Sequence, residues 1–147
     1  MHRDLKPQNL FVVEGTPPTW KVLDFGVSKL ERSGTLTHGN VVGTPGYMAP
    51  EQARGGDVGP TADVFALAVI AYRALTGRPA FSGRELPRVL FDVCYVQPMQ
   101  PTKLTALPDD VERVLALGMA KDAGERIATA AELAAGLRAA FEGGLDA

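Results

Sequence analysis

The stretch HRDLKPQN, residues 2–9, decides how the rest of this chain is interpreted. It places charged and polar side chains around a single apolar residue, Leu5. Pro7 fixes its own φ and has no amide proton, so the stretch is predicted to be a loop or a turn. A loop with this density of charge is typical of a catalytic segment and not of a leader sequence.

A β-hairpin is predicted over residues 10–23, directly after this loop. Two short β-prone runs, LFVV and WKVL, are separated by EGTPPT, whose glycine and prolines favour a turn. Residues 26–46 are rich in Gly, Ser and Thr and lack helical periodicity, which predicts a long loop. Loops of about 20 residues within a small domain are commonly functional, so a functional role is expected here.

The remainder of the chain is predicted to be helical. Asp109 with Glu112, and Thr129 with Glu132, fit the capping-box pattern at a helix start. Apolar periodicity and end signals place the other helices over residues 49–54, 61–75 and 88–95. The fold class is therefore mostly α with a small β-hairpin.

Composition narrows the function classes. The 147 residues suffice for one domain with a core. The net charge of −2 gives no indication of a surface that binds nucleic acid. The longest apolar run, from Val64 to Tyr72, is far short of the ~20 residues of a membrane span, and no secretory signal is visible. The lone Cys94 is expected to be a buried thiol. A cytoplasmic location is expected.

Four motifs occur in a fixed order: HRDLKPQN, the hairpin, DFG at residues 24–26, and GTPGYMAPE at residues 43–51. Together they resemble the C-terminal lobe of eukaryotic-type serine/threonine protein kinases, and the bacterial members most closely. The resemblance implies a kinase domain over residues 1–142, with a tail at 143–147. Within it lie a catalytic loop (2–9), an activation segment (24–51) and a helical subdomain (61–142).

Phosphoryl transfer requires a group that orients the attacking hydroxyl and cations that neutralise the triphosphate. The resemblance makes Asp4 the catalytic base and places the charge of Lys6 near the transferred group. Asn9 and Asp24 offer the oxygen ligands that Mg²⁺ prefers, with Mn²⁺ as an alternative ion and ATP as the phosphoryl donor. Taken singly, Asp4 could instead cap a turn, and Asn9 could satisfy backbone groups.

The substrate class follows from two positions of the resemblance. Lys6 and Thr44 match serine/threonine kinases, so the expected partners are proteins with Ser or Thr acceptors. Candidate phosphorylation sites in the long loop are Ser33, Thr35 and Thr37, and Arg3 would bind such a phosphate. The alternative is a solvated polar loop with no regulatory role.

Structural roles are also implied by the resemblance. His2 is expected to pack near Phe25 of the DFG motif, which ends at Gly26. Asp63 would brace the backbone of the catalytic loop. A buried ion pair is expected between two residues distant in sequence, Glu51 and Arg126.

No G-x-G-x-x-G loop and no V-A-I-K-like lysine occurs in the 147 residues. The chain is therefore expected to be a truncated kinase without the N-terminal lobe and the helix before the catalytic loop, and to have little or no activity. The alternative is a non-catalytic module that binds kinases or their substrates. Loss of the preceding helix would also uncover one flank of the helix over 61–75 and allow self-association through it.

Overall fold

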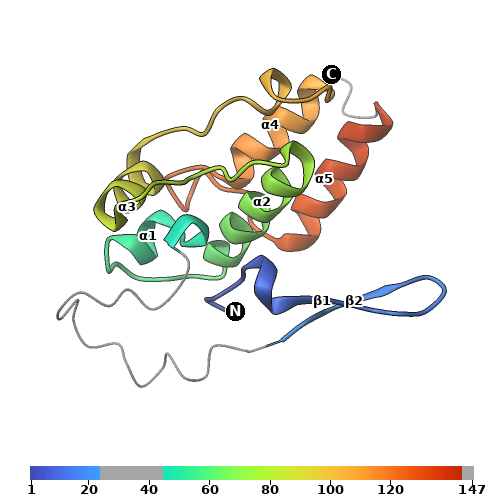
Figure 1. Cartoon of the computed structure of the whole chain (residues 1–147), viewed down its shortest axis with the longest axis horizontal. Coiled ribbons are helices and arrows are strands. Elements are labelled where there is room, and N and C mark those ends of the chain that lie inside the picture. Colours follow the sequence, from blue (N-terminus) through green and yellow to red (C-terminus); the bar gives the residue numbers. More distant parts are fainter. Residues whose placement is uncertain (24–44, 144–147) are drawn as a thin grey trace.

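The chain forms a short β-hairpin followed by a body of helices (Figure 1). The structure, a computed structural model, describes residues 1–23 and 45–143. The hairpin consists of β1 (Leu10–Val13) and β2 (Thr19–Val22) and follows a single 3₁₀ turn, η1 (Pro7–Asn9). The later elements are η3 (Pro45–Tyr47), α1 (Pro50–Ala53), α2 (Thr61–Thr76), α3 (Leu86–Tyr95), η4 (Pro101–Lys103), α4 (Asp109–Gly118) and α5 (Ala130–Glu142). The predicted fold class is confirmed at this level.

The hairpin is antiparallel and extends away from the helices (Figure 1). Leu10 pairs with Val22 and Val12 pairs with Trp20, so these four side chains share one face. Trp20 is 68% exposed and Val12 is 50% exposed, because none of the described helices covers that face. The predicted strands are thus present, but they bury little apolar surface among the described residues.

Helix α2 is the centre of the hydrophobic core, and α4 and α5 pack against it and against each other. Phe65 and Ala68 are fully buried on this helix. A β-carbon on Gly118 would lie 2.7 Å from the methyl carbon of Ala68, so the glycine permits the close approach of α4 to α2. This contact fixes the helical body around the element that carries Asp63.

The expected open flank of α2 is not observed. None of the nine side chains from Val64 to Tyr72 is exposed, and only Leu67, Ile70 and Ala71 are half-buried. Contacts from η3 before the helix and from η4, α4 and α5 after it explain this, since these elements pack around α2. The prediction of an uncovered strip for self-association on this helix is therefore wrong for the described residues.

The two predicted capping boxes have different outcomes. Thr129 is the N-cap of α5, and its side chain accepts a hydrogen bond from the Glu132 amide. At α4 the N-cap is Pro108 and not Asp109, so this prediction is wrong. The Glu112 carboxylate binds Gln100 and Thr102 of the preceding connector instead.

Candidate active site

The backbone of the catalytic loop is held by Asp63 in the first turn of α2. Its two carboxylate oxygens accept hydrogen bonds from the amides of His2 (2.6 Å) and Arg3 (2.8 Å). Arg3 has a φ of 67°, in the left-handed region that side chains other than glycine rarely adopt. A non-glycine residue persists there only when its surroundings fix it, and the two hydrogen bonds of Asp63 do so.

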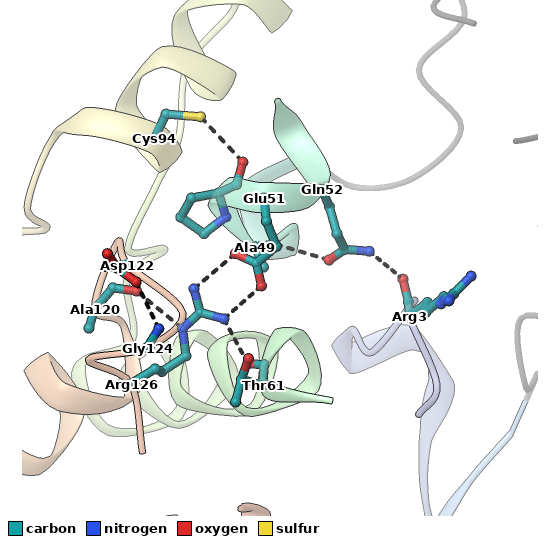
Figure 2. A network of polar contacts seen from close by, with 11 residues as sticks. Arg3, Ala49, Glu51, Gln52, Thr61, Cys94, Ala120, Asp122, Gly124 and Arg126 are labelled. Carbon is teal, nitrogen blue, oxygen red and sulfur yellow. Dashed lines mark hydrogen bonds and ion pairs between the residues drawn. The ribbon is translucent and has the colours of Figure 1, made fainter. Parts of the chain in front are cut away.

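A second clamp on Arg3 comes from Gln52 in α1. The Gln52 amide nitrogen donates to the Arg3 carbonyl (3.0 Å), while its oxygen accepts from the Ala49 amide (3.0 Å), as Figure 2 shows. Gln52 therefore joins the end of the GTPGYMAPE motif to the catalytic loop. Sequence reasoning missed this residue, because an amide inside a short helix carries no signal of a partner 49 positions away.

His2 is buried and links the loop to the end of the hairpin. Its Nδ1 accepts from the Asp4 amide (3.2 Å), so Nε2 carries the proton and donates to the Leu23 carbonyl (3.2 Å). Leu23 is the residue before Asp24. The predicted neighbour of His2, Phe25, lies outside the described residues, so that contact stays a prediction.

Asp4, Lys6 and Asn9 lie together on this loop. Lys6 Nζ is 3.1 Å from Asp4 Oδ2, and both side chains are 22% exposed, so they are reachable from solvent. The Asn9 side chain is buried and donates from Nδ2 to the Asp4 carbonyl (2.9 Å). This bond fixes the loop and leaves the side-chain oxygen as the Asn9 atom that could bind a metal ion.

Of the two predicted magnesium ligands, only Asn9 lies among the described residues. The Leu23 amide donates to the Asn9 carbonyl (2.9 Å), which brings the residue before Asp24 beside Asn9. An amide oxygen and a carboxylate are ligands that Mg²⁺ accepts, with the remaining positions for water and phosphate. Asp24 itself lies outside the described residues, and its role as a ligand stays a prediction.

The remaining predicted residues of the long loop also lie outside the described part of the chain. They are Gly26, Ser33, Thr35, Thr37 and Thr44. The described chain resumes at Pro45.

A cavity of about 10 Å³, with room for one water molecule at most, lies beneath the catalytic loop and is lined by Asp4, Lys6, Tyr47 and Asp63 among others.

Glu51 and Arg126 form an ion pair 75 positions apart in sequence. Arg126 donates from Nη1 and Nη2 to the two carboxylate oxygens (2.8 and 2.9 Å), from Nη1 to the Thr61 carbonyl, and from Nε to the Ala120 carbonyl. Figure 2 shows the guanidinium fork facing the Glu51 carboxylate. Burial alone would raise the pKa of Glu51, but the hydrogen bonds and charge of Arg126 hold this pKa below its ordinary value of 4.5.

Lys121 is a second cation that the fold encloses, and sequence reasoning missed it. Its Nζ lies 4.2 Å from the centre of the Phe81 ring and donates to the Val93 carbonyl at the end of α3 (2.7 Å). Burial lowers the pKa of Lys121 to about 8. These contacts join partners far apart in sequence, so no local pattern reveals them.

The described residues thus define a domain that presents a carboxylate, an ammonium and an amide on one loop clamped to a helical body. A family model described as the protein kinase domain matches residues 1–133, and the chain belongs to that family. This confirms the resemblance found in the sequence.

Three relatives illustrate the match. Serine/threonine-protein kinase Pkn1 of Myxococcus xanthus is 42% identical over 146 residues, 96% of this chain and 21% of Pkn1. The DNA damage-responsive serine/threonine-protein kinase RqkA of Deinococcus radiodurans is 41% identical over 137 residues, covering 91% of this chain and 20% of RqkA. Serine/threonine-protein kinase PrkC of Bacillus subtilis is 34% identical over 146 residues, 97% of this chain and 22% of PrkC.

The chain therefore spans about a fifth of the length of these curated relatives. All three are bacterial serine/threonine protein kinases by name. Within the described residues, no helix is both long enough and apolar enough to cross a membrane.

Proposed function

We propose that this chain supplies the phosphoryl-transfer groups and the peptide-binding part of a serine/threonine protein kinase. The observation that carries the proposal is the clamped loop. Asp63 accepts hydrogen bonds from the amides of His2 and Arg3, just before Asp4, and the Asn9 side chain donates to the Asp4 carbonyl. Transfer reactions of this kind depend on positioning and electrostatics more than on covalent chemistry by the protein. A loop fixed at several points meets that need.

In the proposed reaction, the Ser or Thr hydroxyl oxygen of a protein substrate forms a bond to the γ-phosphorus of ATP. The bond from that phosphorus to the bridging oxygen breaks, ADP leaves, and the hydroxyl proton passes to the Asp4 carboxylate. Lys6, 3.1 Å from Asp4, orients that carboxylate and brings positive charge beside the transferred group. When bound at Asn9 and Asp24, Mg²⁺ would neutralise charge on the triphosphate.

We further propose that the groups that clamp the nucleotide lie outside these 147 residues. The sequence contains no glycine-rich loop of the G-x-G-x-x-G type and no strand lysine of the V-A-I-K type. Oriented binding of reactants contributes ~7–11 kcal/mol to catalysis in favourable cases, so these residues alone are expected to transfer phosphate very slowly.

The proposal is tested by grafting residues 1–147 into the matching region of Pkn1 and assaying the chimera with ATP and Mg²⁺. We expect label on Ser and Thr and none on Tyr. Asp4→Asn should reduce the rate by at least 10²-fold, because the acceptor proton loses its base. Asp110→Asn makes the same change on α4 and should leave the rate unchanged. A folded chimera whose rate is unchanged by Asp4→Asn, or that transfers phosphate to Tyr, would overturn the proposal.

A further inference from the structure

A second cavity, of about 230 Å³, opens between η3, α2 and the loop over residues 79–83. Most of its lining is apolar, including Val69, Phe81 and Val89, and Arg73 is the one charged residue in that lining. We propose that this cavity binds an acidic side chain, aspartate or glutamate, of the protein substrate. The inference rests on the proposed kinase function and specifies which peptides that site accepts.

The walls of the cavity are fixed before any peptide binds. A β-carbon on Gly46 would lie 2.8 Å from the Phe81 carbonyl oxygen, so η3 and the 79–83 loop are in close backbone contact. The Phe81 ring stacks on Phe65 with centroids 6.0 Å apart, and the Lys121 ammonium covers the Phe81 ring. Binding to a preformed cavity avoids most of the ordering cost that a mobile loop would impose.

Arg73 is oriented by one contact, and further N–H groups of its guanidinium can donate to a ligand. Its Nη1 donates to the Tyr47 hydroxyl (2.7 Å), and Tyr47 is buried. A guanidinium has five N–H donors in a planar fork. No carboxylate pairs with Arg73 among the residues that the structure describes, so the described walls of the cavity hold a positive charge without a counter-charge. A carboxylate on the ligand would complete that pairing.

The position of the cavity connects it to the catalytic loop. Tyr47 lines both this cavity and the small one beneath Asp4. η3 also follows directly on Thr44, the residue that the family resemblance assigns to the substrate hydroxyl. The two cavities thus adjoin at Tyr47, and the inference places the acidic side chain close in sequence to the acceptor residue of the peptide.

The test uses the 147-residue chain and fluorescein-labelled peptides without ATP, with binding measured by fluorescence anisotropy. Each peptide carries alanine in place of the acceptor Ser. In a series of such peptides, a single glutamate occupies each position before and after this alanine in turn. Matched peptides carry glutamine or lysine in place of the glutamate. At one position we expect glutamate to bind about tenfold tighter than glutamine. Arg73→Ala should remove that preference, and Arg73→Glu should replace it with a preference for lysine.

Arg113→Glu is the matched control, since it makes the same charge change on an exposed residue of α4 outside the cavity lining. It should keep the preference for glutamate. Arg73→Gln serves as a second variant if Arg73→Glu fails to fold by circular dichroism, and it should abolish the preference. No binding by any peptide, no position that favours glutamate, or a preference that survives both folded Arg73 variants would overturn the inference.

These outcomes separate the inference from the proposed function. The peptides have no acceptor hydroxyl and no ATP is present, so a preference for glutamate that depends on Arg73 supports the cavity whether or not phosphate is transferred. Conversely, a chimera that phosphorylates Ser and Thr while the peptides show no such preference overturns the cavity alone.

Discussion

Arg126 connects three parts of the chain through one side chain that is itself fully buried. It reaches Glu51 at the end of the GTPGYMAPE motif, the Thr61 carbonyl at the start of α2 and the Ala120 carbonyl after α4. Its guanidinium carbon also lies 5.2 Å from the centre of the Phe65 ring. Arg126 therefore fixes the segment that carries Gln52, and through it the backbone of the catalytic loop.

The first prediction concerns this ion pair. Arg126→Ala leaves the Glu51 carboxylate mostly buried without its partner and should lower the free energy of unfolding by about 3–5 kcal/mol. Arg138→Ala removes an exposed arginine of α5 and should change it by less than about 0.5 kcal/mol. Urea titrations of both variants measure the difference. Equal stability of the two variants would show that the ion pair does not hold the fold together.

At the scale of elements, α3 is closed at its C-terminal end by a residue from outside the helix. Lys121 donates to the carbonyls of Asp92 and Val93, where the negative end of the helix dipole lies. The same ammonium covers the Phe81 ring, so it joins α3 to the loop that forms one wall of the Arg73 cavity. Because this charge is costly to enclose, we expect the stability of the fold to depend on pH.

The second prediction follows from that cost. Burial lowers the pKa of Lys121 from 10.5 to about 8, although the charges of Cys94 and Asp92 oppose the shift. Between these two pH values the unfolded chain binds more protons at this residue than the folded chain does. The free energy of unfolding should therefore rise with pH across the window, by at most about 1.4 kcal/mol per pH unit.

Lys121→Met should remove this part of the pH dependence, and Lys103→Met, on an exposed lysine of η4, should retain it. Urea titrations at several pH values between 8 and 10.5 provide the comparison. The same slope in the Lys121→Met variant and the wild-type chain would contradict the account.

Elements with a strong local signal could be predicted from the sequence alone. The hairpin follows from two β-prone runs around a glycine- and proline-rich turn, and α2 follows from an apolar run ended by Gly77. The start of α4 was placed correctly, but its cap was not, because Glu112 finds partners in the preceding connector. Tertiary contacts of this kind override a local capping pattern.

The residues of the candidate site likewise fall into those that the sequence predicts and those that only the folded structure reveals. Asp4, Lys6 and Asn9 were found because they cluster in one motif, HRDLKPQN, and Asp63 was found through the family resemblance. The clamp by Gln52, the enclosed ammonium of Lys121 and the left-handed backbone of Arg3 could not be predicted, since each depends on partners brought together only by folding. The covered flank of α2 was missed because later helices supply neighbours that the sequence does not assign.

At the scale of the whole described chain, exposed large apolar side chains occur on both strands of the hairpin, and none occurs on α2. Val12, Trp20 and Val22 share one face of β1 and β2, and each is at least 37% exposed. Two-stranded hairpins are marginally stable in water unless they pack against further structure. This face therefore offers uncovered apolar surface to a partner.

The third prediction is that the isolated chain self-associates through this face and binds a hydrophobic dye at low micromolar concentration. Trp20→Ser should weaken both effects, because it removes the largest apolar side chain of the face. Phe91→Ser is the matched control: Phe91 is an exposed aromatic residue on α3, and its loss should leave association through the hairpin intact. Sedimentation and dye fluorescence report the outcome. A compact monomer that binds no dye would refute the prediction.

The central claim is that these 147 residues hold the transfer groups of a serine/threonine kinase without the groups that clamp its nucleotide. The most direct measurement compares phosphate transfer from ATP to a basic protein substrate by the isolated chain, by its Asp4→Asn variant and by the Pkn1 chimera. We predict that the isolated chain is no faster than Asp4→Asn, whereas the chimera turns over and depends on Asp4. Robust turnover by the isolated chain that Asp4→Asn abolishes would contradict the claim.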